Sequence, residues 1–230
     1  MKIGGLQKTS LLDYPDAISV IIWTIGCNFR CPFCYNKDLV LGKAKEIPEE
    51  EIFSFLKKRK GLLEGLVISG GEPFLQEDIV DFMEKIKKLG YLIKIDTNGT
   101  FPEKLKEVMD KKLVDYLSMD VKAPKNKYNK LAGIKTNLSK IERSIELIKS
   151  NAPDYEFKTT FVPNLLVEED IIKIAKWLKG AKRFYLQKFK NDVPLISSKL
   201  DKVEPFSKEY INKILEEIKP YFKNCEVRGV

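Results

Sequence analysis

The sequence predicts a parallel α/β protein, an open partial barrel of six strand–helix units in which residues 1–230 form one domain. Short β-branched runs alternate with amphipathic runs six times, which favours a parallel sheet with helices on its outside. No Ser/Gly-rich linker or shift in composition interrupts this alternation. A closed barrel of eight units typically needs ~250 residues, so six units fit the length better. A doubly wound sheet fits the same pattern and stays an alternative.

The elements are expected in the following order. Residues 1–15 form an amino-terminal extension, and the apolar run 18–25 is the first strand. Pro48 then begins a helix with an acidic first turn and a basic last turn, which suits the helix dipole. Glycines at 90 and 180 end two later helices. The other strands are predicted at 66–68, 92–95, 114–119, 157–162 and 184–186, and the other helices at 79–89, 102–110, 138–148, 169–179 and 210–218.

Composition and charge describe a protein of the cytoplasm. Lys and Arg number 41 against 33 Asp and Glu, but the lysines are spread along the chain among acidic residues. That distribution indicates a solvated surface, and nucleic acid is not expected as a partner. The run 18–25 is too short for a bilayer, which needs roughly 20 apolar residues. No signal peptide precedes it, and three clustered cysteines do not suit a secreted disulfide scaffold, so we expect a cytoplasmic location without membrane contact.

Three of the four cysteines, Cys27, Cys31 and Cys34, lie within eight residues. Structural zinc sites and ordinary four-iron ferredoxin clusters use four protein ligands. The remaining cysteine, Cys225, is far away in the sequence, and the chain contains no histidine. The spacing therefore predicts a metal site with three protein ligands and one open position. Cys225 is expected to be an ordinary buried thiol in a short terminal strand.

Unusual polar residues follow the predicted strands at their carboxyl ends, where parallel α/β proteins bind ligands. Each group alone is typical of a turn or a surface pair. Their shared placement on one rim, beside an open metal site, indicates a binding site. The groups are the cysteine loop, Gly70–Pro73, Asp96–Gly99, Asp120 with Lys122, Lys158–Thr160, and Gln187 with Lys188.

Two of these motifs carry a family resemblance. Cys27, Cys31 and Cys34, with Phe33 before the last cysteine, resemble the signature of the radical S-adenosylmethionine (SAM) enzymes, and Gly70–Pro73 resembles the glycine-rich motif of that family. The resemblance implies a partial (β/α)6 barrel and a [4Fe–4S] cluster on the three cysteines. SAM would occupy the fourth iron and be cleaved reductively to methionine and a 5′-deoxyadenosyl radical.

The same resemblance implies how SAM is held. Gly70 and Gly71 would let the backbone approach the methionine part, and Glu72 would face its ammonium group. Phe33 would pack near the adenine, with backbone groups at Tyr35 reading its edge. Asp96 and Asn98 would contact the ribose, and Lys122 or Lys158 the carboxylate. The implied SAM contacts are Phe33, Tyr35, Gly70, Gly71, Glu72, Asp96, Asn98, Lys122, Lys158 and Thr160, with Lys122 also a candidate catalytic residue.

The opening segment 4–15 resembles the activating component of anaerobic ribonucleoside-triphosphate reductase, one of the glycyl-radical-enzyme activases. The resemblance implies a glycyl radical enzyme as protein substrate and a low-potential electron donor such as ferredoxin or flavodoxin. It also implies a monovalent cation beside the SAM carboxylate. One departure is the missing histidine that some activases carry near the position of residues 187–189. The implied cation ligands are Asp96 and Asp120, with backbone groups at Thr97 and Ser118.

Two other functions were weighed. A radical SAM enzyme that acts on a small molecule, such as 7-carboxy-7-deazaguanine synthase, would need further polar contacts inside the barrel. Few polar rim residues are left unassigned, which favours a protein substrate. A nucleic-acid-binding zinc knuckle would need a fourth Cys or His nearby and clustered basic and aromatic residues. Neither feature is present in the sequence.

Overall fold

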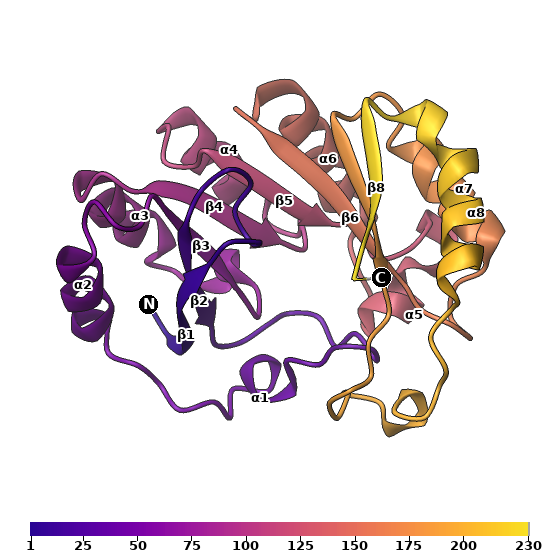
Figure 1. Cartoon of the computed structure of the whole chain (residues 1–230), viewed down its shortest axis with the longest axis horizontal. Helices are drawn as coiled ribbons and strands as arrows, with labels where there is room; N and C mark the ends of the chain where they lie inside the picture. Colours follow the sequence, from indigo (N-terminus) through magenta and orange to yellow (C-terminus); the bar gives the residue numbers. More distant parts are fainter. Residues whose placement is uncertain (230) are drawn as a thin grey trace.

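The computed structural model describes residues 1–229, which contain one eight-stranded sheet with its strands in chain order. The first strand runs antiparallel to the second, and every later neighbour is parallel. The sheet curves, with helices on its outer side (Figure 1), and its two edge strands are not neighbours. This is the predicted open barrel. The strands are β1 (Ile3–Ser10), β2 (Ser19–Thr24), β3 (Gly65–Gly70), β4 (Leu92–Thr97), β5 (Tyr116–Asp120), β6 (Tyr155–Phe161), β7 (Arg183–Lys188) and β8 (Asn224–Arg228).

The helices confirm all six predicted helical segments. Short helices α1 and α5, and four 3-10 turns, were not predicted from the sequence. Among residues 1–229, none of the helices combines the length and apolar character needed to cross a membrane. The helices are α1 (Lys37–Val40), α2 (Glu49–Lys58), α3 (Ile79–Lys88), α4 (Pro102–Asp110), α5 (Tyr128–Ala132), α6 (Leu138–Asn151), α7 (Glu168–Trp177) and α8 (Lys208–Ile218), and the 3-10 turns are η1 (Pro73–Leu75), η2 (Lys125–Lys127), η3 (Ser198–Leu200) and η4 (Lys219–Tyr221).

Strands β2 to β7 are the six predicted parallel strands, and a further strand is added at each edge. The segment treated as an extension contains β1, whose Gly4 and Gly5 lie against neighbouring side chains. A Cβ on Gly5 would come within 2.9 Å of the Trp23 ring, so only glycine permits this approach. At the other edge, Cys225 lies on β8 and is buried, as the sequence predicts.

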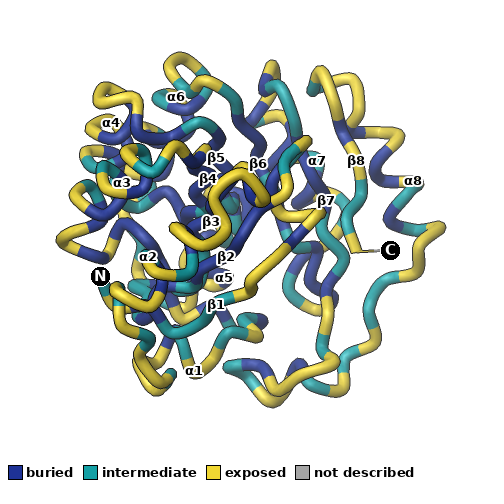
Figure 2. Tube along the Cα trace, turned by 60° about the vertical axis from the view of Figure 1, so that its left-hand side comes forward, coloured by how far each residue is buried: buried dark blue, intermediate teal, exposed yellow. Residues whose placement is uncertain are grey.

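The two faces of the sheet differ in chemistry. Residues that point outward toward the helices are apolar and form the main core. Figure 2 shows the central strands mostly buried, whereas the outer turns of the helices are exposed. Every second residue points instead into the interior of the barrel, which we call the lumen. The outward residues include Val20, Ile22, Leu66, Ile68, Ile93, Ile95, Leu117, Met119, Phe157 and Phe161.

The end of the lumen opposite the cysteine loop is apolar and filled. Ile21, Val67 and Tyr116 are inward-facing residues near the amino ends of their strands and form a separate small cluster. Tyr14, from the loop between β1 and β2, packs into this cluster with its ring centroid 6.1 Å from that of Tyr116. The filled floor leaves the carboxyl ends of the strands as the place for a ligand.

Candidate cofactor site

The three clustered cysteines lie on the loop that follows β2, and their thiols are free. The turn after α5 supports this loop from beneath. Arg30 donates its backbone N–H to the Ala132 carbonyl at 2.8 Å. Gly133 has a φ of +69°, and a Cβ there would lie 2.0 Å from the Arg30 carbonyl oxygen. The loop is therefore seated on a turn that only glycine can form.

A second support comes from the segment 189–207, between β7 and α8, which is the long orange loop of Figure 1. Ile196 donates its backbone N–H to the Cys34 carbonyl at 3.1 Å, and Ser197 donates to the Pro32 carbonyl at 2.9 Å. These two bonds join the first and last thirds of the chain at the cysteine loop. The metal-ligand candidates are thus fixed from both sides of the open barrel.

The thiols are protected from water. Burial, reinforced by the charge of Glu72, raises the pKa of Cys27 to about 11. Burial likewise raises the pKa of Cys31 to about 12, while the nearby Lys122 lowers it. A thiol must lose its proton to bind metal, so binding would release protons here. The charge of Lys122 opposes the rise in pKa at all three cysteines and would favour the thiolates that bind metal.

No three His, Cys, Asp or Glu side chains within residues 1–229 lie close enough to hold a single metal ion. Cysteines that bind different irons of one cluster lie farther apart than the ligands of one ion. The donor set also consists only of sulfur, which suits an iron–sulfur cluster. The residues present therefore fit a [4Fe–4S] cluster.

The glycine pair after β3 is explained by protein packing. A Cβ on Gly71 would lie 1.8 Å from the Gly26 carbonyl oxygen, and one on Gly70 would lie 2.4 Å from the Thr24 nitrogen. Gly71 donates its N–H to the Thr24 carbonyl at 2.9 Å. Both glycines are therefore required for packing against the end of β2 and the start of the cysteine loop. Their predicted approach to the methionine part of SAM stays a prediction.

Glu72 connects two loops of the site. Its carboxylate is fully buried and accepts hydrogen bonds from the Phe74 N–H at 3.1 Å, the Thr97 hydroxyl at 2.8 Å and the Asn98 N–H at 2.7 Å. Burial raises the pKa of Glu72 to about 7, although these bonds oppose the rise. The carboxylate thereby joins the β3 and β4 loops, and its contact with the SAM ammonium group stays a prediction.

Asn98 faces the cysteine loop. Its side-chain amide donates to the Asn28 side chain at 2.8 Å and lies 4.0 Å from the Cys27 Sγ atom. Its carbonyl oxygen accepts from the Thr100 N–H at 3.0 Å. These contacts connect the β4 loop to the first cysteine, and the contact of Asn98 with the ribose stays a prediction.

The lumen contains a continuous line of alternating charges. Lys94 Nζ lies 3.0 Å from Asp96 Oδ1, and Lys158 Nζ lies 3.5 Å from Asp96 Oδ2 and 3.8 Å from Asp120 Oδ2. Lys122 Nζ then lies 3.1 Å from Asp120 Oδ1. Although burial disfavours ionisation, the two adjacent lysines hold the pKa of Asp96 well below its usual range. The predicted residues Asp96, Lys122 and Lys158 are thus brought together as one network.

The predicted cation site would use Asp96, Asp120 and backbone groups at Thr97 and Ser118. The Lys158 ammonium lies 3.5 Å from Asp96 and 3.8 Å from Asp120. An ammonium group therefore stands where the resemblance implies a monovalent cation.

The other predicted contacts lie around the rim. Phe33 is buried, and the Lys122 ammonium lies 5.9 Å from its ring centroid. Tyr35 is 60% exposed, so its backbone and ring are open to the solvent side of the loop. Thr160 pairs in register with Gln187, at the carboxyl ends of β6 and β7. All three positions lie on the same edge of the sheet as the cysteines.

Sequence reasoning missed a second polar cluster in the lumen. Glu156 on β6 is fully buried and accepts two hydrogen bonds from the Arg228 guanidinium, at 2.6 and 2.7 Å. It also accepts from the hydroxyls of Tyr116 and Ser118. The guanidinium lies 3.4 Å from the Tyr185 ring centroid. No sequence signal marks this cluster, because polar residues that alternate along a strand usually face solvent.

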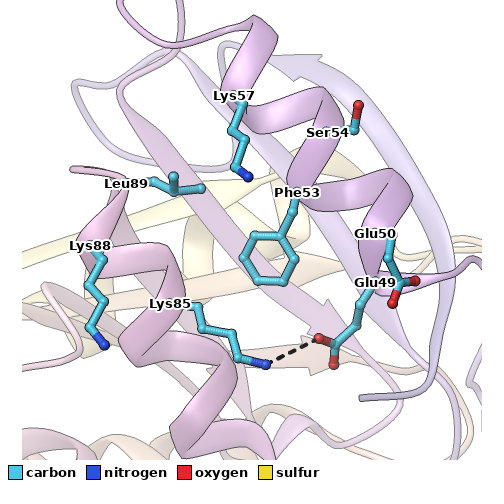
Figure 3. A pocket seen from close by; sticks show the side chains of 8 residues that line it. All are labelled: Glu49, Glu50, Phe53, Ser54, Lys57, Lys85, Lys88 and Leu89. Atoms are coloured by element: carbon cyan, nitrogen blue, oxygen red, sulfur yellow. Dashed lines mark ion pairs between the residues drawn. The ribbon is translucent and has the colours of Figure 1, made fainter.

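A groove of about 570 Å³ lies on the helical side of the sheet, between α2 and α3 (Figure 3). Lys85 is paired across it with Glu49. It contains none of the predicted site residues. Its lining is Glu49, Glu50, Phe53, Ser54, Lys57, Lys85, Lys88 and Leu89.

Comparison with known proteins decides the family. Residues 21–183, more than half of the chain, match the model of the radical SAM superfamily. The chain belongs to the radical SAM superfamily. Membership implies a [4Fe–4S] cluster and SAM as cofactors, in agreement with the fit of the three cysteines.

Individual radical SAM proteins resemble this chain to different extents. A Methanocaldococcus jannaschii protein named as a glycyl-radical enzyme activating enzyme is 38% identical over 192 residues, or 81% of this chain and 79% of that protein. A 7-carboxy-7-deazaguanine synthase of Thermoplasma acidophilum is 32% identical over 152 residues, 65% of this chain and 69% of that protein. The crystal structure of Streptococcus suis SuiB bound to the precursor peptide SuiA superposes with a TM-score of 0.65 at 15% identity, which shows the fold alone. The match covers 90% of this chain and 47% of SuiB, so the chain spans about half the length of that structure.

Proposed function

We propose that this protein is a glycyl-radical-enzyme activase. One electron from the reduced cluster would cleave SAM to methionine and a 5′-deoxyadenosyl radical, which would take a hydrogen atom from a glycine of a partner enzyme. The products would be 5′-deoxyadenosine and a glycyl radical. The observation that carries the proposal is the set of three free cysteines on one loop beside the charged lumen. The likeness to an activating enzyme at 38% identity supports it.

The residues of this chain would act by binding, orienting and shielding. Cys27, Cys31 and Cys34 would each hold one iron and leave the fourth iron to SAM. The lysines at the top of the lumen, Lys122 and Lys158, would attract the SAM carboxylate. Phe33 and the segment 189–207 would exclude water from the cluster, since the segment bonds directly to the cysteine loop.

The finer assignments extend the same proposal. We take the partner to be anaerobic ribonucleotide reductase, because segment 4–15 resembles the activating component of that system. A ferredoxin or flavodoxin would supply the electron, and the protein would act in the cytoplasm as a single domain. Gln187 or Lys188 would stand where some activases carry a histidine.

A second candidate has a specific observation in its favour. The Glu156–Arg228–Tyr185 cluster supplies polar groups inside the barrel, which a small-molecule substrate would need. The likeness to 7-carboxy-7-deazaguanine synthase is consistent with that alternative. However, the Glu156 carboxylate already accepts four hydrogen bonds, two from Arg228 and one each from Tyr116 and Ser118, so it is satisfied within the protein. We therefore favour the protein substrate.

An anaerobic experiment separates the two functions. The cluster-loaded protein is reduced with SAM in the presence of anaerobic ribonucleotide reductase, and the mixture is examined by electron paramagnetic resonance. The proposal predicts a glycyl radical doublet on the partner protein together with 5′-deoxyadenosine. SAM cleavage without a partner radical would favour the small-molecule function.

A further inference from the structure

Lys158 occupies the space between two carboxylates for which the sequence analysis expected a monovalent cation. Its Nζ atom lies 3.5 Å from Asp96 and 3.8 Å from Asp120. We propose that Lys158 is the built-in counter-ion of these two carboxylates, so that the SAM site of this protein works without a bound monovalent cation. The test below measures a thermal unfolding midpoint and a rate of 5′-deoxyadenosine formation. Only the rate rests on the proposed SAM chemistry.

The strand register explains how one ammonium serves two acids. Lys158 on β6 is paired with Asp120 on the neighbouring β5, and Asp96 on β4 is paired with Ser118 on the other side of β5. The lysine side chain crosses over β5 inside the lumen to reach Asp96. An ammonium group has three donors, so it can serve both carboxylates at once. Only 12% of the Lys158 side chain is exposed, so bulk solvent does not separate these charges.

The charge balance of the network argues against an additional cation. Lys94 and Lys122 pair with the outer sides of Asp96 and Asp120, so three ammonium groups face two carboxylates. The network already carries one positive charge in excess. Burying a further unpaired charge is strongly unfavourable, and a bound potassium ion would add one. The excess is instead suited to an anion, and the carboxylate of SAM has that charge.

The test compares salts at constant ionic strength on the cluster-loaded protein. Potassium chloride is replaced by choline chloride, whose cation is too large for the space between the carboxylates. The thermal unfolding midpoint and the rate of 5′-deoxyadenosine formation are measured for the unmodified protein, Lys158→Ala and Lys158→Arg. Lys87→Ala is the matched control, because Lys87 pairs with Asp115 outside this network.

For the unmodified protein, the midpoint should be the same in both salts, and the rate should be the same within about twofold. Lys158→Arg should likewise be insensitive to the choice of salt, whatever its rate relative to the unmodified protein. In choline chloride, the rate of Lys158→Ala should be at least tenfold below that of the unmodified protein. In potassium or ammonium chloride, the variant should regain part of this rate and its unfolding midpoint should rise. Lys87→Ala should respond alike to both salts.

A tenfold loss of rate in choline chloride for the unmodified protein would overturn the proposal, even if Lys158→Ala does not fold. An equal response of folded Lys158→Ala to both salts would also overturn it. The midpoint needs no partner enzyme, so either result can be read even if the activase function is wrong.

Discussion

At the scale of single residues, the site depends on a division between three cysteines that we propose as cluster ligands and one that we do not. Cys27, Cys31 and Cys34 share a loop that is bonded to both α5 and the segment 189–207. Cys225 is buried on β8, where it pairs in register with Phe184. The shared loop is what distinguishes the three proposed ligands.

The first prediction uses this division. Replacing Cys27, Cys31 or Cys34 by alanine should abolish SAM cleavage, because each removes one of three cluster ligands. Cys225→Ala is the matched control and should keep the full iron and sulfide content after anaerobic reconstitution. Iron and sulfide analysis with a 5′-deoxyadenosine assay checks both. Turnover in any of the first three variants, or cluster loss in the control, would contradict the assignment.

Glu72 should give the protein an unusual pH dependence. Its pKa is raised to about 7 by burial, so between its ordinary value of 4.5 and pH 7 the folded state binds more protons than the unfolded state. Its contribution to the free energy of unfolding is then largest at low pH and falls as the pH rises to 7, by about 3 kcal/mol in total.

Urea denaturation of the unmodified protein and Glu72→Gln between pH 4.5 and 7 checks this prediction. The amide cannot ionise, so the difference in stability between the two proteins should shift in favour of the variant as the pH rises. A difference that does not change with pH would show that Glu72 titrates normally in the folded protein. Asp81→Asn, on the exposed surface of a helix, is the control. The difference in stability between this variant and the unmodified protein should not change with pH.

At the scale of secondary-structure elements, strand β8 and the segment 189–207 matter most. Strand β8 brings Arg228 into the lumen, where it pairs with Glu156 and lies over Tyr185. The segment 189–207 brings two backbone donors to the cysteine loop. Both connections tie the carboxyl-terminal third of the chain to the site, and each can be tested by one substitution.

Arg228→Ala should lower the free energy of unfolding by about 2 kcal/mol, because it leaves the buried Glu156 carboxylate without a cation. Breaking a buried pair typically costs 3–5 kcal/mol, and the estimate is smaller here since 34% of the Arg228 side chain is exposed. Lys213→Ala removes an exposed pair with Glu168 and should change stability by less than about 0.5 kcal/mol. Chemical denaturation compares the two, and equal losses would contradict the importance of the pair.

Ile196→Pro should loosen the cysteine loop, because proline cannot donate to the Cys34 carbonyl. We expect the reconstituted cluster to be lost several times faster on exposure to air, as followed by the decay of its visible absorbance. Ile196→Ala keeps the N–H group and trims the side chain, so it serves as the control. The prediction fails if both variants lose the cluster at the same rate.

At the scale of the whole molecule, the sequence predicts more of the fold than of the site. The six parallel strands follow from β-branched runs such as 66–68 and from helices with clear apolar periodicity. Strand β1 escaped prediction because Gly4, Gly5 and four polar residues leave it without a strand pattern. Helix α5 has only five residues, too few to show a helical period.

The cysteine loop could be predicted because its spacing is unusual in itself. The contacts of Glu72 and Asn98 could not, because the sequence does not show that both side chains turn toward neighbouring loops. Lys94 and Glu156 were missed because alternation along a strand is the same whether the polar face meets solvent or lines a barrel. Only the curvature of the sheet decides between these two settings.

We propose that three cysteines leave one cluster position open and that SAM fills it. The most direct test is to supply one electron per cluster to the reconstituted protein under anaerobic conditions, with SAM and no partner enzyme, and to quantify the products. We expect methionine and 5′-deoxyadenosine in equal amounts, the 5′-deoxyadenosyl radical taking its hydrogen atom from the buffer or the protein. Full reduction of the cluster with SAM left intact would contradict this expectation.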